Sequence, residues 1–169
     1  MAYRELVYKG SLTLRKKCRP VEKFDKRLWD LLDDMKETLA RSNGVGLAAP
    51  QVGVVRRVFI IDKGIPEGEA GDYLELINPE IVETEGEQEG MEGCLSVPGK
   101  WGIVKRPMRV RVKFLDRNGD PQEFEGTELM ARAICHENDH LSGVLYTDVC
   151  ERMLTEEEIE EWERTKEEA

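Results

Sequence analysis

The amino-acid sequence predicts an α+β fold in which antiparallel strands cluster ahead of a helix, with a further helix at the C-terminus. Segments rich in β-branched and aromatic residues lie between about residues 57 and 127, bounded by Gly and Pro as strands usually are. Strands and helices do not alternate along the chain, which argues against a parallel α/β sheet. A length of 169 residues suits one core, so we expect a single domain over residues 1–169.

The individual elements follow from hydrophobic spacing. Apolar residues at helical spacing predict an amphipathic first helix, and the alternation of Val110, Val112 and Phe114 with cationic residues predicts one arm of a hairpin. The other arm follows a turn at residues 116–120. The predicted helices are 21–42, 128–140 and 155–166, and the predicted strands are 57–62, 73–77, 81–84, 109–114 and 122–127.

Composition narrows the class of protein. The chain has no run of roughly 18 apolar residues, which a membrane helix needs, and its start lacks a secretory profile, so we expect a cytoplasmic protein with no membrane contact. The net charge of −10 disfavours general nucleic-acid binding. Residues 151–169 contain nine Glu and only three basic residues, which predicts a solvated acidic helix face. The basic residues are Arg152, Arg164 and Lys166. Four cysteines without CxxC spacing make a disulfide framework improbable.

The two histidines of the chain frame the segment HENDH at residues 136–140. Positions four apart on a helix share a face, so His136 and His140 can bind one metal ion, and Glu137 can contact water bound to it. Such a site typically needs a third protein ligand. A zinc protease would take a Glu from a following helix, here Glu156, Glu157 or Glu160, whereas the competing donor is Cys94.

Three segments together resemble the signature motifs of peptide deformylases. They are GVGLAAPQ at residues 44–51, EGCLS at 92–96 and HENDH at 136–140, in the order and approximate spacing of that family. The resemblance covers nearly the whole chain, including residues 14–25, and is closest to the bacterial type. It implies antiparallel sheets packed around a central helix that carries the H-E-x-x-H motif.

The resemblance also implies a mechanism and a set of site residues. The metal ligands would be Cys94, His136 and His140, and a metal-bound hydroxide would attack the formyl carbonyl of an N-formylmethionyl chain, with Glu137 as general base and then general acid. The Gln51 amide and the Leu95 backbone N–H would stabilise the negative charge that develops on the formyl oxygen. The expected substrate-binding residues are Val45, Gly46, Glu92, Gly93, Leu129 and Ala133.

The expected cofactor is one divalent metal ion, Fe²⁺ in the cell, with Zn²⁺, Ni²⁺ and Co²⁺ as alternatives. The expected partners are N-formylmethionyl peptides and nascent chains, with transient ribosome association. The family pattern commonly has Gln where this chain has Cys135 and an apolar residue where it has Asn138, and an Asp-Pro near the N-terminus is replaced. The acidic tail does not match the basic helix by which some members dock on ribosomes. The competing functions are a zinc endopeptidase and an inactive relative that binds formylated chains or a ribosomal partner.

Overall fold

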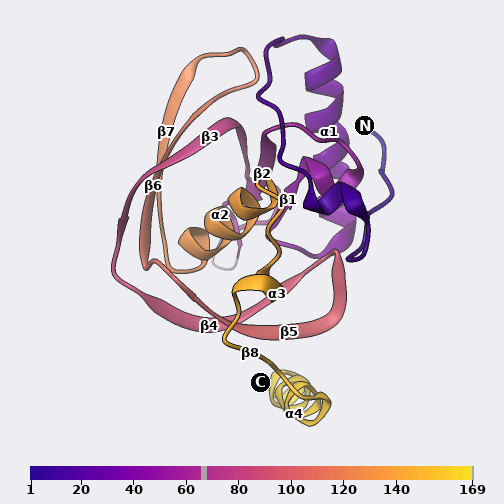
Figure 1. Ribbon diagram of the computed structural model, residues 1–169, viewed down its shortest axis with the longest axis vertical. Helices are drawn as coiled ribbons and strands as arrows, with labels where there is room; N and C mark the ends of the chain where they lie inside the picture. The colour runs from indigo at the N-terminus through magenta and orange to yellow at the C-terminus, as the bar shows by residue number, and fades with distance from the viewer. Residues whose placement is uncertain (66–67, 169) are drawn as a thin grey trace.

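The computed structural model describes residues 1–65 and 68–168 and contains two antiparallel sheets with a helix between them (Figure 1). The larger sheet has the strand order β1-β2-β3-β6-β7. Its strands are β1 (Gly46–Ala48), β2 (Val58–Asp62), β3 (Tyr73–Glu85), β6 (Arg109–Leu115) and β7 (Pro121–Thr127). The β6–β7 pair is the hairpin that the sequence predicts, in a register that sets Val110 opposite Gly126 and Val112 opposite Phe124.

The second sheet has the order β4-β5-β8 and is absent from the sequence prediction. It consists of β4 (Gln88–Cys94), β5 (Val97–Arg106) and β8 (Arg152–Met153). Four glycines and several charged residues lower the β-propensity of the two long strands, so no alternating apolar pattern marks them. The strands form because Val97 and Val104 pack with Tyr146 in a core of their own.

Strand β3 joins two segments that the sequence predicts as separate strands. Pro79 lies inside the run and separates 73–77 from 81–84 in the sequence pattern. The structure accommodates it at a register shift, where Asn78 has a φ of 51° and Pro79 needs no ladder hydrogen bond. One strand of 13 residues therefore connects both halves of the larger sheet.

The first helix, α1 (Lys26–Ser42), begins later than predicted. The Asp25 carboxylate accepts a hydrogen bond from the Leu28 backbone N–H and caps the helix, while the Val21 N–H donates to the Asn78 side chain. Residues 21–25 are therefore not helical. The predicted apolar stripe is confirmed within the helix, but its first member, Phe24, precedes the helix and is only partly buried. The others pack into one core cluster: Leu28, Leu31, Leu32, Met35 and Leu39 are all buried.

Helix α2 (Leu129–His140) lies at the centre of the fold (Figure 1). It contacts β1, β2, β6 and β7 of the larger sheet and β5 of the smaller one. The remaining elements are η1 (Leu12–Arg15), η2 (Ala49–Val52), α3 (Tyr146–Val149) and α4 (Glu156–Glu168). Helices α2 and α4 agree with the predicted second and third helices within two residues at each end. Among the described helices, none is long and apolar enough to cross a membrane.

Candidate metal centre

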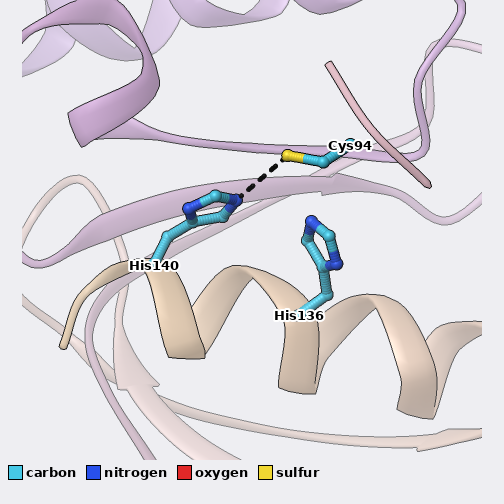
Figure 2. A group of neighbouring side chains, drawn as sticks. All are labelled: Cys94, His136 and His140. Carbon is cyan, nitrogen blue, oxygen red and sulfur yellow. Dashed lines mark hydrogen bonds between the residues drawn. The ribbon is translucent and has the colours of Figure 1, made fainter. Parts of the chain in front are cut away.

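Helix α2 presents two imidazoles and one carboxylate to the interior of the fold. His136, Glu137 and His140 are 7%, 4% and 1% exposed, and the two imidazole rings meet edge to face with centroids 5.1 Å apart. Buried polar side chains on a helix are costly unless they have partners. The two imidazoles point to the same side of the helix, which indicates a site there (Figure 2).

The third donor comes from the end of β4. The Cys94 Sγ lies 3.5 Å from the His140 Nε2, and one potential ligand atom from each of Cys94, His136 and His140 lies within 4.8 Å of the others (Figure 2). A register shift between Glu92 and Cys94 interrupts the β4–β5 pairing at this point. The alternative ligands Glu156, Glu157 and Glu160 are on α4 and are not in this group.

The donor set fits a divalent cation. Bond lengths of about 2.3 Å to sulfur and about 2.0 Å to imidazole nitrogen would set tetrahedral ligand atoms roughly 3.3 to 3.6 Å apart. The Cys94–His140 distance of 3.5 Å already has that value. One buried oxygen of the adjacent Glu137, Oε1, has no hydrogen-bond partner among the described residues and lies 4.0 Å from His140 Nε2. A water molecule beside a bound cation would give that oxygen a partner.

The two imidazoles differ in their electrostatic surroundings. Burial lowers the pKa of His136, but the charge of Glu137, the Cys94 sulfur and the hydrogen bond with Glu92 together raise it well above its usual value. Burial, with the charge of His136, lowers the pKa of His140 well below its usual value. An imidazole must be deprotonated to bind a metal ion. A cation at this site would therefore compete with a proton at His136, whereas the lowered pKa of His140 favours its neutral form.

Behind His136 lies a buried carboxylate held by two arginines. Glu92 Oε1 is 2.6 Å from His136 Nδ1, and Arg106 and Arg132 both donate hydrogen bonds to the same carboxylate. Burial raises the pKa of Glu92, but the His136 and Arg106 contacts bring it down to about 2. Arg106 also donates to Asp139 across 2.7 Å. Glu92 therefore fixes the ring so that Nε2 points away from it, toward Cys94 and His140.

Gln51 lies in η2 and is held by three contacts. Its Oε1 accepts a hydrogen bond from the Ala48 backbone N–H at 2.9 Å, and its Nε2 donates to the Ser96 hydroxyl at 3.1 Å. The same Nε2 is 3.5 Å from the Cys94 sulfur. Leu95 follows Cys94 in the short turn between β4 and β5, outside their paired registers. The amide of Gln51 and the backbone at Leu95 thus border the same point.

Glu137 is a carboxyl group with a raised pKa. Burial raises its pKa to about 7, aided by the charges of Glu92 and Asp139 and opposed by His136 and Arg106. A carboxyl group that titrates near neutrality can both accept and release a proton. Gly46 in β1 lies directly against it, because a Cβ at that position would be 2.8 Å from Glu137 Oε2.

The apolar residues expected to bind substrate lie beside the candidate metal ligands. On α2, Leu129 is four residues before Ala133, and Ala133 is three residues before His136. This spacing places all three on one side of the helix. Val45 and Ala133 pack in the same core cluster. Sequence reasoning missed Arg106, Arg132, Ser96 and Asp139, which act on the site through other side chains. Glu92 needs such partners because it is buried, which only the structure shows.

One cysteine sulfur and two imidazoles around a buried carboxyl group are the arrangement of a mononuclear metal-dependent hydrolase. A sequence model of the polypeptide deformylase family matches residues 3–156. The chain belongs to the polypeptide deformylase family, whose members are metal-dependent hydrolases that remove the N-terminal formyl group from proteins.

Relatives and solved structures agree with this assignment. The chain is 53% identical over 161 residues to a peptide deformylase of Thermoanaerobacter pseudethanolicus, covering 95% of this chain and 98% of the relative. It is 52% identical over 160 residues to one from Caldanaerobacter subterraneus, with coverages of 95% and 97%. A crystal structure of the Legionella pneumophila peptide deformylase superposes with a TM-score of 0.82 at 39% identity, covering 99% of both chains. The Thermotoga maritima enzyme gives 0.82 at 38% identity, with coverages of 89% and 99%. The endopeptidase and the inactive-relative hypotheses are not favoured.

Proposed function

We propose that Cys94, His136 and His140 hold the metal ion of this deformylase, with Glu137 as the proton-transfer group. The convergence of these three donors beside the buried Glu137 is the observation that carries the proposal. A bound divalent ion would supply Lewis-acid polarisation of the formyl carbonyl and a lowered pKa for water beside it. The chain's own groups then supply orientation and proton transfer.

Glu137 takes one proton from the attacking water while the new C–O bond forms at the formyl carbon. Negative charge develops on the formyl oxygen, and the Gln51 amide and the Leu95 backbone N–H donate to it. Glu137 then delivers its proton to the departing nitrogen as the C–N bond breaks, so a free amine and formic acid leave, and the acid ionises to formate in solution. The pKa of about 7 suits both halves of this task.

We propose that the substrate binds as an added strand. Strands β1 and β4 are both edge strands, one in each sheet, and the metal ligand Cys94 ends β4 while Gly46 begins β1. Extended peptides add to free sheet edges through main-chain hydrogen bonds, which read little sequence. Val45, Gly46 and Gly93 supply this backbone, and the methionine side chain enters between Val45, Leu129 and Ala133. The carboxylate of Glu92 is already occupied by three side chains, so we propose that it orients His136 at the rim of this pocket.

The closing test compares wild type with Glu137→Gln after anaerobic purification. We expect metal content to stay and release of free amine from formyl-Met-Ala-Ser to fall at least about 10²-fold, the usual contribution of a general base. Glu157→Gln, on the outer helix α4, is the matched control and should retain wild-type activity. Equal activity in Glu137→Gln and wild type would remove Glu137 from its role. Cys94→Ser should lose metal, whereas a Glu-ligated endopeptidase site would keep it.

The identity of the metal and the place of action are further proposals. We propose Fe²⁺, because a thiolate and two imidazoles suit it as well as Zn²⁺ and because the resemblance to the family implies it. Metal analysis of anaerobically purified protein tests this.

Formylated nascent chains as substrate support a cytoplasmic enzyme with transient ribosome association. Salt-dependent co-sedimentation with ribosomes carrying nascent chains, compared with empty ribosomes, tests that association.

A further inference from the structure

The two faces of the β4–β5 sheet have different surroundings at the metal site. Glu92 and Gly102 are paired across the strands and face inward, where Glu92 meets His136 and a Cβ on Gly102 would be 3.1 Å from the Tyr146 ring. Side chains alternate along a strand, so Gly93, which follows Glu92, faces the outer side of the sheet. A Cβ at Gly93 would lie 2.6 Å from the Trp101 ring. The Trp101 ring therefore covers the outer face of Gly93, directly before the metal ligand.

A second tryptophan extends this surface. The rings of Trp101 and Trp162 have centroids 5.1 Å apart at 57°, and we refer to the two side chains as the aromatic shelf. Trp162 belongs to α4, which lies beyond the small sheet on the side away from α2 (Figure 1). The Leu154 N–H donates to the Trp101 carbonyl across 2.8 Å and fixes the chain leading to this helix. Both indoles are only partly buried.

The family match ends at residue 156, so Trp162 lies outside the shared catalytic region. Nothing in the proposed hydrolysis requires it. The Lys166 ammonium of the same helix lies 5.1 Å from the centroid of the Trp162 ring. A partly buried aromatic pair beside a substrate-binding strand is a feature of the kind that contributes to recognition.

We propose that the aromatic shelf contacts the side chain of the second residue of the formylated substrate and favours a large apolar or aromatic residue there. This inference rests on the proposed strand-like binding. If the methionine side chain points inward to α2, the next side chain of an extended peptide points to the opposite face. Next to Gly93 that face is covered by Trp101, and Trp162 continues the surface. The methionine pocket and the shelf would then read the first two residues on opposite sides of the small sheet.

The test measures kcat and KM for formyl-Met-Phe-Ser, formyl-Met-Leu-Ser, formyl-Met-Ala-Ser and formyl-Met-Gly-Ser. We expect KM for the Phe peptide to be about three- to tenfold below that for the Ala peptide, the size of one aromatic contact, with kcat nearly constant. In Trp101→Ala this ratio should approach one, and in Trp162→Ala it should fall part of the way. The formyl-Met-Ala-Ser reaction, measured in each variant, is the reference for this ratio.

Trp29→Phe is the control, because Trp29 is on α1, at the opposite end of the molecule from α4 (Figure 1), where its Nε1–H donates to the Arg117 carbonyl in the turn between β6 and β7. It should keep the wild-type ratio. Should Trp101→Ala fail to fold, Trp101→Leu retains apolar cover over Gly93 and still removes the indole. A wild-type ratio of one, or a ratio that survives in both shelf variants, overturns the inference. Loss of turnover of every formylated peptide by wild type would instead refute the proposed function, so the two failures are distinguishable.

Discussion

Glu92 holds His136 through a 2.6 Å contact between Oε1 and Nδ1, and two buried arginines hold Glu92. Carboxylates that orient a metal-binding imidazole usually contribute about 10- to 100-fold to metal affinity. Glu92→Gln keeps the shape of the side chain but removes the charge that faces Arg106 and Arg132. We expect metal affinity to fall by about that factor. Competition with a chelator measures it.

The matched control for this change is Glu89→Gln on the same strand, where the side chain is exposed. It should bind metal as the wild type does. Unchanged affinity in Glu92→Gln would mean that the carboxylate serves the packing of the two arginines only. The unfolding free energy of metal-free protein measures the role in arginine packing alone, because buried arginines that lose a charged partner destabilise the fold whether or not metal binds.

The close approach of Gly46 to Glu137 makes a second prediction. A methyl group at residue 46 would lie 2.8 Å from Oε2 and 2.9 Å from Cγ of Glu137, so the carboxyl group or β1 must move. A displacement of about 1 Å can cost 10²-fold in rate. Gly46→Ala should therefore lower kcat by about that factor and leave metal content unchanged. Metal analysis and steady-state kinetics on the same preparation check both parts, and full activity would show that Glu137 is not constrained by β1.

Gln51 offers a third prediction, since its amide is fixed at both ends by Ala48 and Ser96. Removal of one donor to a developing oxyanion costs about 10²- to 10³-fold in kcat. We expect Gln51→Leu to show that loss. Ser96→Ala should show a smaller one, because it frees the amide without removing it. If Gln51→Leu raises KM alone, the amide binds the ground state rather than the developing charge.

Several parts of the site could be predicted from the sequence because their spacing is local. The i, i+4 histidines on α2 and the hairpin of β6 and β7 follow from residues close together in the chain. Cys94 was one of two competing donors until the resemblance to a family favoured it as the third ligand, since residues 94 and 136 are far apart in sequence and a lone cysteine has no pattern. The structure joins them through β4 and α2.

Long-range partners account for most of what the sequence could not predict. Arg106 and Arg132 reach Glu92 from 14 and 40 residues away, and neither has a sequence pattern that marks it. The small sheet forms on tertiary packing, because its glycines and charges carry little strand propensity. The start of α1 also depends on a distant residue. The helix begins after Asp25, which caps it, and not at Val21, because the Val21 N–H is bonded to the Asn78 side chain.

The last prediction concerns acid stability and a charge cluster between the hairpin turn and α1. Arg117 and Lys36 both pair with the mostly buried Glu75, with N–O distances of 2.5 and 2.7 Å. Burial raises the pKa of Glu75, but hydrogen bonds from Arg117 and Lys36 outweigh it and bring that pKa below its usual value. A carboxylate with a depressed folded pKa stabilises the protein fully above its unfolded pKa, near 4.5, and the stabilisation is lost as pH falls through the folded pKa. Urea unfolding of metal-free protein from pH 7 down to pH 3 should therefore show falling stability, in one transition if residues 1–169 are a single domain. Glu75→Gln should lower stability at pH 7 and flatten this dependence, whereas Glu80→Gln, exposed on the same strand, should leave the curve unchanged. An equally steep curve in Glu75→Gln would assign the acid sensitivity to other carboxylates.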